Sequence, residues 1–332
     1  MRDIKRRRSS IQSTGQITRA MKLVATVKLQ KAREKAEHTR PYSDGVYQTM
    51  QSILERSAGI SHPYLQGGDN PRKAVIVMTS NRGLAGGYNA NVVKLITQGN
   101  FDLKELDIYA VGKKGKDALQ RAGCKISLDC SDICEEPTYA DAAALGRRVL
   151  TSFAQGEVGE IWLAYTSFIN TVVHEPRLIR LLPVSKEDVD EKVEREGSAG
   201  LKLQMNFEAE EESILEMLIP KYMISMIYGG LLEAAASENG ARMQAMDSAT
   251  SNAEEMISDL SLKFNRARQA SITQELTEII SGANASTSNY RRCCGDRLAG
   301  RIGNKETVYG SRKNWKDHTG HRCRTGYSLP GG

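Results

Sequence analysis

The sequence is poor in the features that mark enzymes, membrane spans and nucleic-acid binders. Aromatic residues make up 6% of its 332 residues, too few to form a stacking platform for bases. No run approaches the 18 consecutive apolar residues of a membrane-spanning helix. The five histidines are scattered, and the motifs HExxH and GxSxG are absent. We therefore predict no catalytic, cofactor-binding or metal-ligating residue, no membrane insertion and no binding of nucleic acid.

The cysteines do not form a recognisable metal or redox motif. No two of the six make a CxxC pair, the spacing that many zinc and redox sites use. A zinc site built from the last three cysteines with His318 and His321 is an alternative that the spacing does not favour. Free thiols in a reducing compartment are the better prediction. The six residues are Cys124, Cys130, Cys134, Cys293, Cys294 and Cys323.

The net charge of +6 lies at the two ends of the chain. Residues 1–40 hold 12 Lys and Arg against 3 Asp and Glu, and residues 286–332 hold 10 against 3. The remaining 245 residues therefore carry a net charge of about −10. The excess of basic residues is therefore divided between the two ends and does not indicate a single basic face, which argues against a nucleic-acid interface.

A repeat near the carboxyl end predicts a long helix with a partner. Small and apolar residues recur at alternating steps of three and four over roughly seven heptads, the period of a left-handed coiled coil. No proline lies between Pro220 and Pro330, so a helix from about Lys221 to Ser281 can run unbroken for roughly 90 Å. The repeat positions are Leu215, Leu218, Tyr222, Ser225, Gly229, Leu232, Ala236, Asn239, Met243, Met246, Thr250, Ala253, Ile257, Leu260, Phe264 and Ala267.

The amino end carries a second, thinner stripe. Residues 2–55 are predicted to be helical, with Pro41 as their one proline. The stripe is too narrow to cover a sheet but suits the seam of a coiled coil. We therefore expect the first helix to pair with the last one. The stripe consists of Ile4, Ile11, Thr18 and Ala25, with Thr14 and Met21 in the adjacent row.

Between the helices the pattern changes to short strands that alternate with helices, which is typical of parallel βαβ units. Strands are predicted at 74–80, 106–112, 125–129 and 160–169, and helices at 88–98, 114–123 and 139–155. Residues 171–184 are expected to continue the sheet. Residues 185–213 are acidic and interrupted by glycine, and we expect a loop that leads into the last helix.

A glycine-rich loop, residues 81–87, follows the first predicted strand. It lacks the Gly-Lys-Ser/Thr ending of a phosphate-binding P-loop, and Gly83, Gly86 and Gly87 do not have the GxGxxG spacing. A glycine turn between a strand and a helix is common for steric reasons alone. We therefore do not predict a nucleotide site at this loop.

Four segments resemble the gamma subunit of bacterial F-type ATP synthases. Residues 2–29 resemble its amino terminus, and residues 272–285 (ITQELTEIISGANA) resemble its carboxyl-terminal signature. Residues 79–89 (TSNRGLAGGYN) resemble its central loop, and residues 233–243 (EAAASENGARM) its long helix. The likeness covers residues 1–285 in the expected order.

The resemblance implies an α/β fold with a long antiparallel coiled coil, in which a central Rossmann-like α/β domain that binds no dinucleotide is inserted between the amino- and carboxyl-terminal helices. It predicts a coiled-coil shaft of residues 1–55 and 209–285, an α/β domain of residues 70–184, an acidic loop of residues 185–208 and an atypical basic tail of residues 286–332. A translated frameshift is the favoured explanation of the tail, and a genuine extension is the alternative. No cysteine lies in 185–210, where plastid members carry a regulatory dithiol, so such regulation is not expected.

The resemblance also implies a function. The family member is a rotor without catalytic activity or cofactor of its own, and it couples ion flow to the conformational cycle of the catalytic beta subunits. Its expected partners are three alpha and three beta subunits, the epsilon subunit and the membrane ring of c subunits. Its expected location is peripheral, on the cytoplasmic face of the bacterial cell membrane. A cytosolic coiled-coil scaffold whose α/β domain binds another partner is the alternative.

Two groups of residues match contact positions of that family. The first is expected to touch the beta subunits and consists of Arg7, Arg8, Arg19, Met21, Lys22, Lys28, Arg242, Arg268, Gln269 and Thr273. The second is expected to form the pivot in the apical collar of the ring and consists of Ile272, Leu276, Ile279 and Ile280.

Overall fold

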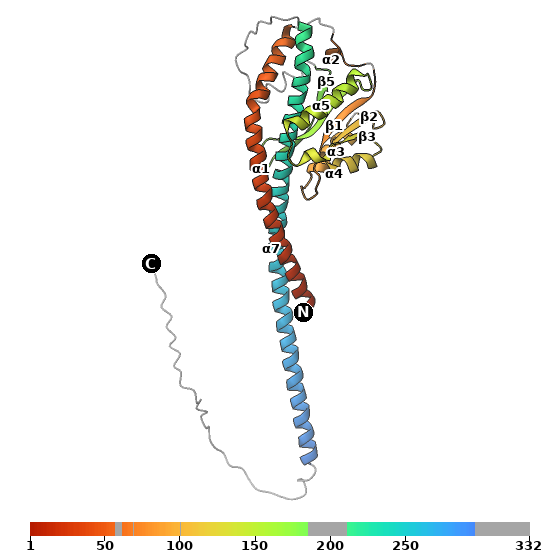
Figure 1. Cartoon of the computed structure of the whole chain (residues 1–332). Helices are drawn as coiled ribbons and strands as arrows, with labels where there is room; N and C mark the ends of the chain where they lie inside the picture. Colours follow the sequence, from red (N-terminus) through yellow and green to blue (C-terminus); the bar gives the residue numbers. More distant parts are fainter. Residues whose placement is uncertain (57–61, 69, 100, 185–210, 296–332) are drawn as a thin grey trace, which may run out of the picture. The chain divides into compact units, whose positions relative to one another are not determined.

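The computed structural model describes residues 1–56, 62–68, 70–99, 101–184 and 211–295. The chain divides into two units, Met1–Arg266 and Ala267–Gly332. The predicted acidic loop, 185–208, and residues 296–332 of the predicted tail lie outside the described residues. Figure 1 labels the helices and strands.

Two long helices begin and end the described chain. Helix α1 is Arg2–Arg56 and helix α7 is Glu211–Gly295. Both helices contain a proline, Pro41 and Pro220, although proline removes one backbone hydrogen bond. The neighbours Ile219 and Tyr222 are 0% and 3% exposed, so tertiary packing holds the helix through Pro220. Helix α7 thus starts before the predicted Lys221 and continues beyond Ser281.

Helices α1 and α7 lie side by side and antiparallel in the first unit (Figure 1). The hydroxyl groups of Thr18 and Thr250 are 2.7 Å apart, and those of Ser43 and Ser225 are 3.2 Å apart. The two contacts are 25 positions apart on each helix, from Thr18 to Ser43 on α1 and from Ser225 to Thr250 on α7. The pairing therefore keeps one register between these points, as an uninterrupted heptad repeat requires.

The seam of α1 differs in one row from the prediction. Ile4, Ile11, Thr18 and Ala25 are buried or half-buried as expected, and so is Met21 of the adjacent row, but Thr14 is exposed. The second row contains Arg8, Gly15, Lys22 and Leu29 instead. Gly15 allows the close approach, because a Cβ atom there would lie 3.4 Å from the Cβ of Ala253.

The central domain is a five-stranded sheet in the order β3-β2-β1-β4-β5. Strands β1 to β4 are parallel, and β5 is antiparallel to β4. The fold class predicted from the sequence is confirmed. The strands are β1 Lys73–Met78, β2 Leu106–Val111, β3 Lys125–Asp129, β4 Glu160–Phe168 and β5 His174–Leu182; the helices are α2 Pro63–Gln66, α3 Tyr88–Thr97, α4 Lys113–Arg121, η1 Ser131–Cys134 and α5 Tyr139–Ala154.

Strand β1 shows how the sheet buries both faces. Its side chains alternate between the two faces, so Ile76 and Met78 join the core that α1, α5 and α7 cover. Val75 and Val77 join the second core, under α3 and α4. One stretch of α7 therefore packs against α1 and the sheet together, and every residue from Tyr222 to Ile227 is buried. Beyond this stretch the seam residues Met246, Thr250 and Ala253 are buried while most of their neighbours are exposed.

Two adjacent glycines of α7 allow a test of this packing. A Cβ atom on Gly230 would lie 3.1 Å from Leu163 Cδ2, whereas one on Gly229 would meet nothing within 4 Å. We expect Gly230→Val to lower the free energy of unfolding by about 1–3 kcal/mol through overpacking. Gly229→Val should raise it by about 0.5 kcal/mol through helix propensity. Urea unfolding of the full chain measures both, and equal effects would contradict the close packing of α7 on the sheet.

Candidate functional site

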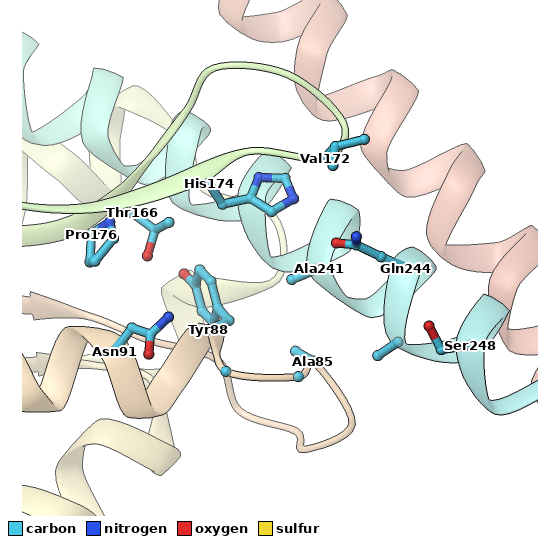
Figure 2. Close-up of a pocket in the computed structure, with 13 residues that line it drawn as sticks. Ala85, Tyr88, Asn91, Thr166, Val172, His174, Pro176, Ala241, Gln244 and Ser248 are labelled. Carbon is cyan, nitrogen blue, oxygen red and sulfur yellow. The ribbon is translucent and has the colours of Figure 1, made fainter.

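The crevice at the carboxyl ends of the strands is largely occupied by α7. In open α/β sheets, ligands bind where the strand order reverses, which here is between β1 and β4. The Tyr88 hydroxyl donates to the Ala234 carbonyl oxygen (3.2 Å), and the Ser237 hydroxyl donates to the Thr166 carbonyl oxygen (3.1 Å). Helix α7 thus lies at the place where ligands bind in other open α/β sheets, and Figure 2 shows the cavity that remains beside it.

The glycine-rich loop between β1 and α3 is held by side-chain amides. The Ser80 backbone N–H donates to Asn89 Oδ1 (2.8 Å), and the Asn81 amide donates to the Ser131 carbonyl oxygen (2.8 Å). Two loop residues have positive φ angles, Leu84 (65°) and Gly86 (56°). At Gly86 the glycine relieves the strain of this conformation.

A buried polar cluster joins η1 to α7 beside this loop. The Cys134 thiol donates to the Thr79 carbonyl oxygen (3.0 Å) and lies 3.7 Å from Glu238 Oε2. Glu238 pairs with Arg242 at 2.7 Å, and each side chain is 13% exposed. Burial, and then the Glu238 charge, raises the pKa of Cys134 to about 12. This thiol is therefore protonated and unreactive at neutral pH.

The pKa values of three other groups in the α/β domain are also raised. Burial, followed by the charge of Glu238, holds the pKa of Tyr88 well above its ordinary value. Burial likewise raises the pKa of Cys124 and Cys130. In the described part of the chain, no group of three His, Cys, Asp or Glu residues is placed to hold a metal ion. The cluster connects η1 and the end of strand β1 to helix α7.

Several of the predicted contact residues on α1 already have partners within the chain. Arg19 pairs with Glu254 and Lys22 with Asp247, both at 2.6 Å between the helices. The Arg8 guanidinium lies 5.6 Å from the centroid of the Phe264 ring. Sequence reasoning missed the two acidic partners, although opposite charges beside a heptad seam are the signal for such pairs.

Glu135 connects α1 to the α/β domain. It lies 3.9 Å from Lys28 Nζ and 3.5 Å from Arg82 Nη2 of the glycine loop. Lys28 thus has a partner within its own chain. Of the two remaining predicted contacts on α1, Arg7 is exposed and Met21 is half-buried.

The described part of the second unit is helical from Ala267 to Gly295. Several of its predicted contact residues are exposed to solvent. Arg268, Gln269 and Thr273 are exposed. The four predicted pivot residues follow at steps that place them on one face of a helix. They are 48–67% exposed and consist of Ile272, Leu276, Ile279 and Ile280.

Helix α7 is also apolar enough, by length and composition, to be a candidate membrane span. The candidate extends over Ile214–Ala285 with a mean hydropathy of 1.2 in its most apolar window. That window is 56% buried inside the structure, as expected for a core helix.

Comparison with known proteins identifies the family. The ATP synthase family pattern matches residues 1–285. An ATP synthase gamma chain from Lachnoclostridium phytofermentans is 60% identical over 286 residues, which cover 86% of this chain and 98% of that protein. The chain belongs to the ATP synthase gamma chain family. The gamma chain of Alkaliphilus metalliredigens is 43% identical over the same shares of both chains, and the gamma chain of Acetobacterium woodii, named as sodium ion specific, is 39% identical.

Solved structures agree with this assignment. A chain in a Euglena gracilis mitochondrial ATP synthase aligns with 93% of this chain and 98% of its own length, at a TM-score of 0.60 and 17% identity. A chain of the Tetrahymena thermophila central stalk and c-ring structure aligns with 70% and 99%, at a TM-score of 0.52 and 26% identity. As a gamma chain, this protein is a rotor subunit of a membrane-associated ATP synthase complex, and the scaffold alternative is not favoured.

The Cys134 cluster predicts a specific pH dependence. Because its pKa is raised to about 12, only about one molecule in ten thousand carries the Cys134 thiolate at pH 8. The rate of alkylation should therefore rise about tenfold per pH unit from pH 7 to 10. Glu238→Gln removes a charge that raises this pKa, so Cys134 should react faster at each pH, as measured by peptide mass spectrometry.

Two controls separate this effect from local unfolding. Glu254→Gln removes a carboxylate of the same helix far from the cluster and should leave the Cys134 rate unchanged. Cys124, which is buried in the other core, should react at the same rate in all three proteins. If Glu238→Gln leaves Cys134 unchanged or accelerates Cys124 equally, the charge does not control the thiol.

Proposed function

We propose that this chain is the non-catalytic central shaft of its complex, surrounded by three alpha and three beta subunits and seated on the epsilon subunit and the membrane c-ring. Its proposed location is the cytoplasmic face of the bacterial cell membrane. The observation that carries the proposal is the 60% identity with a bacterial gamma chain over 98% of that protein.

The coiled coil has the properties that such a shaft needs. Each beta subunit would prefer the conformation that fits the face of the shaft before it, so rotation shifts its population between states. This coupling requires that the two helices do not slide past each other. The paired hydroxyl groups of Thr18 with Thr250 and of Ser43 with Ser225 hold one register. Packing on the sheet then ties the shaft to the α/β domain.

The basic residues of α1 suit contacts that change during rotation. Arg19 and Lys22 make exposed ion pairs with Glu254 and Asp247, and such pairs contribute only about 0–1 kcal/mol each. An acidic loop of a beta subunit can therefore exchange with these partners at little cost. The same reasoning applies to Lys28, which pairs with Glu135. Arg242 is 13% exposed, so its contact would be limited to the rim of its guanidinium.

The second unit supplies the proposed pivot. Four large apolar side chains are exposed on one face of its helix, and water-exposed apolar faces of this kind mark interaction surfaces. We assign this face to the apolar collar of the ring. Arg268, Gln269 and Thr273 would add polar contacts with the beta subunits just before it.

Assembly tests the function. When the chain is expressed with the alpha and beta subunits of its own ATP synthase, we expect native mass spectrometry to show a 3:3:1 complex that hydrolyses ATP. The chain purified alone should have no ATPase activity. The same experiment is done with a chain that ends at Ala285. If it assembles and couples as the full chain does, residues 286–332 are not required.

The scaffold alternative predicts that the chain does not assemble with alpha and beta subunits. A chain that stays a solitary monomer or a homodimer beside folded alpha and beta subunits would contradict the rotor function.

The pivot gives a residue-level prediction. The double substitution Leu276→Gln, Ile280→Gln removes two of the exposed apolar side chains and should reduce recovery of the 3:3:1 complex about tenfold or more, because each contributes roughly 1.5–3 kcal/mol when buried. Glu278→Gln is the matched control, because Glu278 pairs with Gln274 on the opposite face of the helix. Equal recovery of the double variant and the control would exclude this face as the pivot.

A further inference from the structure

A cavity of about 300 Å³ remains in the crevice between the sheet and α7. Figure 2 shows the side chains around it. They come from the glycine loop and the start of α3, from β4 and β5, and from the stretch of α7 beyond Gly240. Its size is at the lower end of the range for small-molecule sites.

Two side chains on this cavity have polar atoms without a partner among the described residues. Thr166 is 3% exposed, and its Oγ1 makes no hydrogen bond. Neither ring nitrogen of His174 makes one, and both atoms are buried. The imidazole is fixed in place by the Phe168 ring (5.7 Å between centroids) and by close contact with Gly240. Buried groups of this kind normally have a hydrogen-bond partner, from the protein, water or a ligand.

The floor of the cavity is suited to a negative charge. Gly86 and Gly87 line it, with φ angles of 56° and −84°. Neighbouring residues with opposite φ signs direct successive backbone N–H groups toward one side and form an anion-binding nest. Helix α3 begins here, its N-cap Gly87 offers no side-chain cap, and its first turn holds no acidic residue. The positive end of the helix dipole therefore lies at the cavity, and its first N–H group, that of Tyr88, already donates to the Ala85 carbonyl oxygen (3.2 Å).

We propose that this cavity is a binding site for a small oxyanion, held by the start of α3, the Thr166 hydroxyl and the His174 imidazole. Each of these groups can donate a hydrogen bond to an oxygen atom of the anion. Among the described residues that line the cavity, none is Asp, Glu, Lys or Arg, so no carboxylate repels the ligand. The site needs the fold, because its donors come from three parts of the chain.

Among the groups around the cavity, His174 is the one whose protonation should change when the anion binds. Burial lowers the pKa of His174, so the imidazole is neutral before the anion binds. Tyr88 stays protonated because its pKa is raised. Two acids on the elements that surround the cavity are each paired with a base, Glu238 with Arg242 on α7 and Glu175 with Arg177 on β5. A bound anion would favour the charged imidazole, so binding should strengthen as the pH falls.

Histidine signals test the site in the full chain alone, which makes the outcome independent of the rotor function. Labelling with ring-¹³C histidine gives one Cε1–Hε1 NMR signal for each of the five histidines, and His174→Gln assigns the relevant one. We expect sodium phosphate, added at constant ionic strength, to shift the His174 signal in a saturable way and to raise its pKa. The other four signals should not follow. Parallel titrations with sulfate and acetate identify the preferred oxyanion.

Thr166→Val is the decisive variant because it removes the hydroxyl and keeps the shape. We expect it to weaken phosphate binding about ten- to hundredfold, the loss of one hydrogen bond to a charged group. Thr151→Val, at an exposed position of α5, is the matched control and should bind as the parent does.

The proposal is overturned by any of three results. The His174 signal does not saturate with phosphate, sulfate or acetate, which means that only water fills the cavity. In the second result, the His174 signal shifts equally with sodium chloride, or all five histidine signals shift together, which indicates charge screening alone. The third is unchanged affinity in Thr166→Val. The parent titration stands by itself if that variant fails to fold.

Discussion

The antiparallel register of α1 against α7 is the constraint on which the rest of the structure depends. Two hydroxyl pairs, Thr18 with Thr250 and Ser43 with Ser225, lie the same number of residues apart on both helices. A slip of one residue would break both contacts between the helices, although Thr18 and Thr250 also donate within their own helices to the Gly15 and Met246 carbonyl oxygens. It would also move Gly15 away from Ala253, where a larger side chain would hold the helices apart. Small residues and paired hydroxyls thus specify one register.

Helix α7 belongs to two parts of the structure. It is one of the two helices of the coiled coil, and it also packs on the α/β domain, where Gly230 and Gly146 permit close contact. The crevice that such a sheet would offer to a dinucleotide is occupied by Tyr88, Ser237 and the buried Glu238–Arg242 pair. A rotor gains from this arrangement because the domain and the shaft cannot move separately without breaking a packed core. The same crowding leaves the small cavity beside His174.

The surface chemistry of the chain is consistent with a part that turns within other proteins. The ion pairs of Arg19 and Lys22 are exposed and exchangeable, whereas the Arg242 pair is covered and fixes the interior. The predicted pivot residues form an exposed apolar face in the second unit. Weak polar contacts along the shaft and a stronger apolar contact at its tip would allow rotation about a retained axis.

The sequence by itself determined the two helices, their pairing and the alternation of strands and helices, because heptad and strand periods are local patterns that survive without a partner. It also identified the family from segments near each end. Only the tertiary structure decided that Gly15 and not Thr14 lies in the seam, that α7 continues through Pro220, and that Glu254 and Asp247 accept the basic residues of α1. It alone brought Thr166, His174 and Gly87 around one cavity. These features depend on residues far apart in the chain, and the free energy of long-range packing can outweigh local propensity.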